Sequence, residues 1–207
     1  MNLEDLLKPK SGDVWDKYVP IITSKNHTEV FLTDQIDDPS EYNELCFRLK
    51  TASPAEVFTL YINTPGGIID SAVMIIDAIK TSKAKVIAEI SGTVASAGTI
   101  ITLACDEVIV ADHTSFMIHN YSGGMVGKGH EMKARQEFVD AHLNTSFKIF
   151  YKDFLSDDEM EAIIDGKDMW MGKEEVVARL NGTFHNKPTS ASKTTTRRRG
   201  RPAKKDK

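Results

Sequence analysis

A serine, a histidine and an aspartate stand in an order that suits nucleophilic catalysis, and the serine has the most suggestive surroundings. Ser96 lies in Gly-Thr-Val-Ala-Ser-Ala-Gly, a stretch of small residues at 92–98. A serine hydroxyl becomes a useful nucleophile only where a base removes its proton and backbone amides face the developing oxyanion. Small residues would let a strand turn into a helix here, leaving Ser96 near a helix N-terminus, where free N–H groups favour negative charge. Taken alone, a serine among small residues is usually a packing choice.

Two further segments would complete such a site. Asn63-Thr64-Pro65-Gly66-Gly67 follows an expected strand and precedes an expected helix, and consecutive glycines let a backbone approach a ligand closely. His119 ends the apolar run SFMIHN and is a candidate general base. A plain turn and a structural histidine are the respective alternatives.

The remaining chemistry-bearing residues give no metal or nucleotide signal. The other histidines show no metal-ligand spacing, so the sequence predicts no metal and no organic cofactor. They are His27, His113, His130, His142 and His185. The stretch GGMVGKGH superficially resembles a phosphate-binding loop, but Ser122 replaces its first glycine and Gly129 stands where Ser or Thr must hold magnesium. The chain is therefore not expected to hydrolyse ATP.

The bulk composition is that of one soluble domain. The chain has 207 residues, 41% hydrophobic and 27% charged. No run of about 18 apolar residues occurs, so no membrane-spanning helix is predicted, and the start MNLEDLLKPKSGD does not resemble a secretory signal. Cys46 and Cys105 are expected to be buried thiols in a reducing compartment, which predicts a cytoplasmic location.

Charge is distributed unevenly along the chain. The net charge of −4 combines an acidic body with a basic tail, because residues 187–207 hold nine lysines and arginines and one aspartate. The tail has no large apolar side chain, so disorder is predicted from residue 186 onward.

Short apolar strands alternate with helices in the body of the chain, which predicts an α/β domain. Strands are expected near 29–36, 57–63, 85–91, 106–112 and 115–120. Helices are expected at 42–52, 68–82, 92–105, 129–152, 156–165 and 173–180. Ser156 with Glu159 three positions later has the pattern of a helix capping box.

Several of these segments together resemble the ClpP serine peptidase family, from about residue 30 to about residue 180. The resemblance is carried by FLTDQIDD (31–38), YINTPGG (61–67), GTVASAG (92–98), FMIHN (116–120) and DMWMGKEEVV (168–177). It implies a ClpP/crotonase-like α/β fold of repeated β-β-α units, with a long protruding "handle" helix near 129–152 that interlocks two rings. The implied division is an N-terminal extension at 1–25, a peptidase domain at 26–185 and the basic tail at 186–207.

The resemblance also implies roles for individual residues. Ser96 would be the nucleophile, His119 the base and Asp168 the third triad member, although nearby Asp165 remains an alternative. The amides of Gly67 and Ala97 would form the oxyanion hole. The family acts on protein or peptide substrates within stacked heptameric rings that a separate AAA+ ATPase supplies with unfolded chains. Phage members also exist, some acting in capsid maturation, for which the location would be the host cytoplasm.

Two other classes of function compete with a peptidase. One is a catalytically dead scaffold of this fold that binds DNA through its tail, where Arg199-Gly200-Arg201-Pro202 resembles the AT-hook that enters the A·T minor groove. General attraction to polyanions or a solvated tail would also explain these residues. The other class is a crotonase-like enzyme acting on acyl-CoA thioesters, which needs the glycine amides but no Ser-His-Asp set.

Overall fold

A mixed α/β sheet organises the chain in the computed structural model, which describes residues 19–182. Its seven strands are β1 (Ile21–Ser24), β2 (His27–Leu32), β3 (Val57–Thr64), β4 (Lys85–Ala95), β5 (Glu107–Val110), β6 (Ser115–Ile118) and β7 (Met169–Gly172). Their order is β1-β2-β3-β4-β6-β7, and β5 pairs with β4 off this path. The pairs from β2 through β3 and β4 to β6 are parallel, while β1 and β7 are antiparallel at the two ends.

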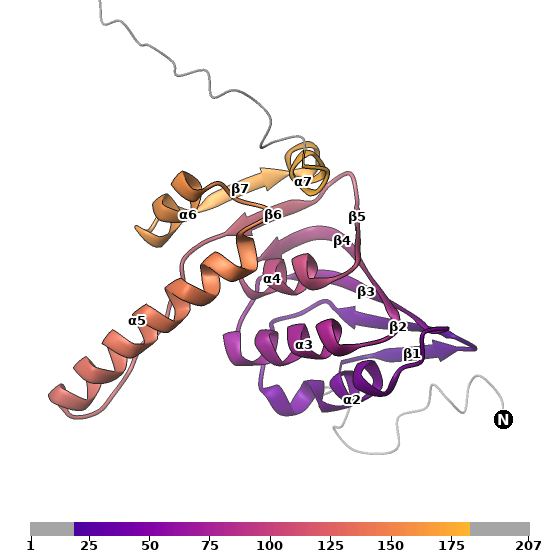
Figure 1. Cartoon of the computed structure of the whole chain (residues 1–207), viewed down its shortest axis with the longest axis horizontal. Coiled ribbons are helices and arrows are strands. Elements are labelled where there is room, and N and C mark those ends of the chain that lie inside the picture. The colour runs from indigo at the N-terminus through magenta and orange to yellow at the C-terminus, as the bar shows by residue number, and fades with distance from the viewer. Residues whose placement is uncertain (1–18, 183–207) are drawn as a thin grey trace, which may run out of the picture.

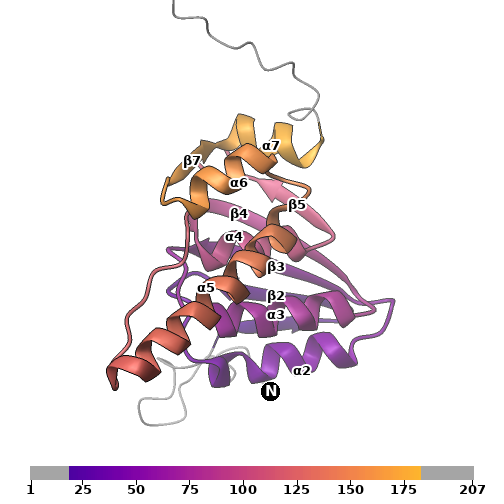
Figure 2. The same cartoon turned by 60° about the vertical axis from the view of Figure 1, so that its left-hand side comes forward.

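Helices cover one face of this sheet and one end of it. They are the 3-10 helix η2 (Pro39–Tyr42) and the α-helices α2 (Asn43–Thr51), α3 (Ile69–Thr81), α4 (Ala97–Ala104), α5 (Gly129–Tyr151), α6 (Asp157–Ile164) and α7 (Lys173–Leu180). Figures 1 and 2 show α2, α3 and α4 side by side on one face, with α6 and α7 beside β6 and β7. The α/β class expected from the sequence is confirmed.

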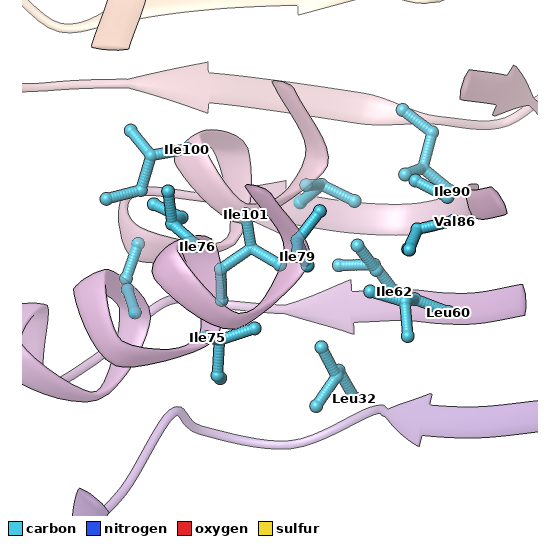
Figure 3. Packing of buried hydrophobic residues seen from close by; sticks show 14 of the residues in the cluster. Leu32, Leu60, Ile62, Ile75, Ile76, Ile79, Val86, Ile90, Ile100 and Ile101 are labelled. Atoms are coloured by element: carbon cyan, nitrogen blue, oxygen red, sulfur yellow. The ribbon is translucent and has the colours of Figure 1, made fainter. Parts of the chain in front are cut away.

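The core lies between the sheet and this helical layer. Its helix-borne members on α3 recur every three to four residues, at Ala72, Ile75, Ile76 and Ile79, which places them on one face of the helix. The strands contribute alternate residues such as Leu60 and Ile62. Figure 3 shows the α3 and α4 isoleucines packed over these strand residues. Burial of this apolar layer holds the carboxyl ends of the parallel strands in fixed positions.

The segment 92–95 corrects one sequence prediction. It was expected to begin a helix, but it continues β4 up to Ala95, and the helix starts only at Ala97. Thr93, Val94 and Ala95 pair with β6, and their β-branched or small side chains suit a strand. Tertiary pairing therefore outweighs the small-residue pattern that suggested a helix.

Two short strands were not predicted. β1 lies in the segment expected as an N-terminal extension and pairs with β2. β7 precedes α7 and pairs with β6. Both have four residues, too few for a clear alternation of apolar and polar side chains. The predicted basic tail, including Arg199–Pro202, and most of the predicted extension lie outside the described residues.

Helix α5 extends from the body, as Figures 1 and 2 both show. Its 23 residues agree with the predicted helix at 129–152. The chain between β6 and α5 runs back along this helix, where the Tyr121 hydroxyl donates to Asp140 and receives a hydrogen bond from Gln136. Farther on, the predicted capping box is confirmed, since the Ser156 and Glu159 side chains each accept from the other residue's amide.

Both cysteines are free thiols. Cys46 is buried, Cys105 is half-buried, and neither forms a disulfide. Within residues 19–182, no helix has both the length and the apolar character needed to cross a membrane.

Candidate active site

Three predicted site segments meet at one edge of the sheet. β3, β4 and β6 are parallel neighbours, so their carboxyl ends lie at the same edge. Ser96 follows the last residue of β4, and His119 follows the last residue of β6. The Gly66-Gly67 pair comes two residues after β3 ends. The parallel topology thus gathers residues that are 23 to 53 positions apart in the sequence.

These segments line one cavity of about 390 Å³. Of the predicted site residues, the cavity wall includes Gly67, Ser96, Ala97 and His119. Ser96 and His119 are both half-buried, which leaves their side chains accessible from the cavity. Asp168 is not among the lining residues.

The Ser96 backbone adopts a conformation that L-residues rarely take. Its φ of 52° and ψ of −122° fall outside the strand and helix regions. The Ser96 amide donates to the Met117 carbonyl at 2.9 Å, and its own carbonyl accepts from the Thr99 amide at 2.9 Å and the Thr99 hydroxyl at 2.6 Å. Such strain persists only where the surroundings enforce it, and it is typical of functional sites. Here it produces a sharp turn from β4 into α4, with Ser96 as the N-cap residue.

Gly66 makes this turn possible because nothing larger fits against Ser96. A Cβ atom on Gly66 would lie 2.6 Å from the Ser96 Cβ and 2.8 Å from the Ala95 carbonyl oxygen. Its φ of +95° also favours glycine. Gly67, at φ +150°, lies so close to Ile36 that a Cβ would be 2.1 Å from the Ile36 carbonyl oxygen.

The amides of Gly67 and Ala97 are available at the cavity wall. Ile36 bonds to the residues on either side of Gly67, accepting from the Ile68 amide and donating to the Gly66 carbonyl. Ala97 is the first residue of α4, where an amide has no intrahelical acceptor. In the described part of the chain neither amide donates to another protein group, so both can donate to a ligand.

The β6–β7 ladder ends one residue before His119 on one strand and one residue after Asp168 on the other. The β6–β7 ladder pairs Ile118 with Met169, and the next residues along the two strands are His119 and Asp168. Directly opposed residues of an antiparallel pair point to the same face. Asp165 instead caps the end of α6. Across residues 19–182, no hydrogen bond joins the side chains of Ser96, His119 and Asp168, and Asp168 is exposed.

Asn120 ties the end of β6 to the end of α6. Its side-chain amide donates to the Ile164 carbonyl at 2.8 Å, and its side-chain oxygen accepts from the Tyr121 amide at 2.8 Å. The histidine segment is therefore fastened to the polypeptide that leads into Asp168.

An apolar wall of the cavity was not predicted from the sequence. It comes from α5, through Leu143, Phe147, Phe150 and Tyr151. Their spacing of three and four residues places them on one face of a helix, so the signal was present within the predicted helix 129–152. Ile68, Ile69 and Ile100 also line the cavity. The site therefore combines a polar edge with an apolar enclosure, a common composition for ligand sites.

No metal centre accompanies this site. Among the described residues, no group of three or more His, Cys, Asp or Glu side chains is arranged to hold an ion. The serine, the histidine and the backbone amides at the cavity wall are groups that can serve as nucleophile, base and oxyanion donors.

A strained serine at a strand-to-helix turn shares one cavity with a histidine and backbone amides, an arrangement typical of α/β serine hydrolases. The chain belongs to the Clp protease family, whose model matches residues 13–179.

Individual relatives agree with this assignment. The chain is 29% identical to ATP-dependent Clp protease proteolytic subunit 2 of Pseudomonas aeruginosa over 153 residues, which covers 72% of this chain and 76% of the relative. It is 30% identical to the proteolytic subunit of Streptococcus suis over 159 residues, covering 72% and 79%. With subunit 1 of Chlamydia abortus it shares 26% over 180 residues, covering 79% and 90%.

Proposed function

We propose that the chain is an endopeptidase that cleaves unfolded or structural proteins with Ser96 as nucleophile, His119 as general base and Asp168 as the carboxylate that orients His119. The observation that carries this proposal is the meeting of Ser96, His119 and the Gly67 amide at one cavity. The pairing of Ile118 with Met169 supports Asp168 over Asp165.

The proposed reaction proceeds through an acyl-enzyme. Ser96 Oγ attacks the scissile carbonyl carbon while His119 takes the hydroxyl proton, and the carbonyl oxygen becomes an oxyanion held by the Gly67 and Ala97 amides. The C–N bond then breaks as His119 returns the proton to the leaving amine. Water, deprotonated by His119, next attacks the acyl carbon, and the second collapse releases the carboxyl product and restores Ser96.

Closing the triad requires Asp168 to turn toward His119. Asp168 stands beside His119 on the paired strand end but is exposed, so its side chain has room to rotate. Assembly that covers this edge would remove water and strengthen the interaction between the carboxylate and the imidazole.

The proposed working form is a homo-oligomer of heptameric rings that encloses the cavities, with α5 as the handle between rings. The relatives are named proteolytic subunits of an ATP-dependent protease, which favours a separate AAA+ unfoldase as partner. Native mass spectrometry tests the ring size, and masses at multiples of seven chains of 23.0 kDa are expected. A protein that stays monomeric at micromolar concentration would contradict the proposed ring assembly.

Hydrolysis of a short fluorogenic peptide tests the catalytic assignment. Ser96→Ala should lower kcat by a factor on the order of 10⁴ or more, because the nucleophile is lost. Ser91→Ala, which changes an exposed serine on the strand that leads to Ser96, is the matched control and should keep normal activity. Cleavage that survives in Ser96→Ala at the normal rate would remove the peptidase proposal.

The comparisons give no support to a dead scaffold. DNA binding by the tail remains a separate proposal, which rests on the sequence Arg199-Gly200-Arg201-Pro202 alone.

A further inference from the structure

A chain of hydrogen bonds leads from the end of α5 through two buried hydroxyls to the backbone of Ser96. The Tyr151 hydroxyl lies 2.5 Å from the Thr99 hydroxyl, and the Thr99 hydroxyl donates to the Ser96 carbonyl at 2.6 Å. Tyr151 and Thr99 are 52 residues apart in the sequence and belong to α5 and α4. Their contact therefore depends on the tertiary fold.

The direction of the proton donors follows from chemistry. A threonine hydroxyl has one proton, and the Thr99 proton is committed to the Ser96 carbonyl. Thr99 must then accept from Tyr151, which makes the tyrosine the terminal donor of the chain. Burial raises the pKa of Tyr151, which favours the protonated phenol that this donor role requires.

Both groups are shielded from water. Thr99 is 0% exposed and Tyr151 is 3% exposed. Loss of Thr99 would leave the Tyr151 hydroxyl without its partner, whereas loss of the Tyr151 hydroxyl would leave Thr99 bonded to the Ser96 carbonyl alone. The Tyr151 ring is held as well, since it packs against Phe147 with ring centroids 4.6 Å apart.

The orientation of the Ser96 carbonyl determines the direction of the Ala97 amide, because both belong to one peptide group. That orientation is set by ψ of Ser96, and the backbone there has a conformation that must be enforced from outside. A shift in ψ would rotate the Ala97 peptide and move its amide away from the place where an oxyanion would form. We infer that Tyr151 and Thr99 are positioning residues, which hold the Ser96–Ala97 peptide in the orientation needed for attack. This inference rests on the proposed role of Ser96 as nucleophile.

The helix that carries Thr99 also supplies a matched control. Thr102 is 1% exposed, and its hydroxyl donates to the Gly98 carbonyl at 2.8 Å. This is a similar hydrogen bond, one turn farther along α4, without contact to Ser96. Thr102→Val therefore reproduces the loss of a buried hydroxyl and leaves the Ser96 carbonyl untouched.

Steady-state kinetics of full-length variants on a fluorogenic peptide tests the inference. Thr99→Val should lower kcat about tenfold and Tyr151→Phe about fivefold, the rate equivalents of one neutral hydrogen bond, with KM within about twofold. Thr99→Ser, which keeps the hydroxyl, should restore most of kcat. The double variant should be no slower than Thr99→Val alone, because both changes break one chain. Thr102→Val should keep kcat within about twofold at a similar loss of Tm.

Three results would overturn the inference. They are equal losses of kcat in Thr99→Val and Thr102→Val, normal kcat in Tyr151→Phe, and multiplying effects in the double variant. Since Tyr151→Phe removes one oxygen and keeps the ring, it remains informative if Thr99→Val does not fold. Full activity in Ser96→Ala would instead refute the peptidase mechanism, so the two failures are distinguishable.

Discussion

Ile118 and Met169 are paired residues in the antiparallel ladder between β6 and β7. One step beyond this pair, His119 follows the last residue of β6 and Asp168 precedes the first residue of β7. The pair therefore links the histidine segment with an acidic residue 49 positions later in the sequence. Asp165, the alternative carboxylate, lies at the end of α6.

This pairing leads to a prediction that separates the two aspartates. Asp168→Asn should lower kcat by a factor of about 10² to 10⁴, because an amide neither orients a neutral histidine in the required tautomer nor stabilises its charged form. Asp165→Asn should stay within about twofold of the unmodified chain. Peptide hydrolysis by both variants, at equal concentration of assembled particle, is the measurement. The reverse order of effects would reassign the third member of the triad.

Gly66 gives a second prediction. Gly66→Ala would force a Cβ against Ser96 at 2.6 Å and place alanine at φ +95°. Displacement of Ser96 should lower kcat by about 10² or more, and the strained backbone should cost about 1–3 kcal/mol of unfolding free energy.

Gly124→Ala is the control for Gly66→Ala, since a Cβ there meets no atom within 4 Å. It should retain both activity and stability. Peptide hydrolysis and urea unfolding provide the two readouts. Unchanged activity in Gly66→Ala would mean that the close approach to Ser96 is unimportant.

A third prediction concerns stability in acid. Arg179 is 2% exposed and bonds to Glu159 and Glu175, each at 2.8 Å. The hydrogen bond with Arg179 is the main cause that lowers the pKa of Glu159 from 4.5 to about 2. A pKa lowered in the folded state contributes stability that is present above about pH 4.5 and is lost as the pH falls toward 2.

Glu159→Gln should therefore be less stable than the unmodified chain at pH 7, and the difference should shrink steadily below pH 4.5. Urea unfolding at pH 7, 5 and 3 measures this. Glu161→Gln, an exposed glutamate on the same helix, is the control and should show little difference at any of these pH values. A constant gap between Glu159→Gln and the unmodified chain would show that the Glu159 carboxylate charge does not contribute.

A fourth prediction concerns the basic tail. Removal of residues 187–207 should abolish salt-sensitive DNA binding, because nine of the chain's basic residues are lost together with the Arg-Gly-Arg-Pro segment. Peptide hydrolysis should be unaffected. Fluorescence anisotropy with an A·T-rich duplex at 50 and 200 mM salt is the measurement. Equal DNA retention by the shortened chain at low salt would locate binding elsewhere.

Much of the fold was accessible from sequence patterns. Isoleucines at helical spacing predicted the buried face of α3. Ser156 and Glu159 predicted the start of α6. The β4 extension to Ala95 was not accessible, because the small residues of 92–95 are compatible with either structure until β6 pairs with them. The short strands β1 and β7 likewise depend on pairing with a neighbouring strand, β2 and β6 respectively.

Some parts of the candidate site could also be predicted from the sequence, and others could not. Ser96, His119 and the glycine pair were predicted from motifs that resemble one family in order, and the structure places Gly67, Ser96 and His119 at one cavity. The contacts that support them were not predicted, because Tyr151 reaches Thr99 across 52 residues and Arg179 reaches Glu159 across 20. Glu175 is four residues before Arg179 on the same helix, but nothing in the sequence KEEVVARL marks Arg179 as buried, since the contact with Glu159 of α6 forms only in the folded chain.

Reaction with a fluorophosphonate probe tests the central claim most directly, because the probe forms a covalent bond with an activated serine and leaves ordinary hydroxyls unmodified. Peptide mapping by mass spectrometry should find a single adduct, on Ser96, and none in Ser96→Ala. His119→Ala should react at least about 100-fold more slowly, since the base is missing. An unmodified Ser96 in an assembled particle, or an equal adduct in Ser96→Ala, would contradict the account.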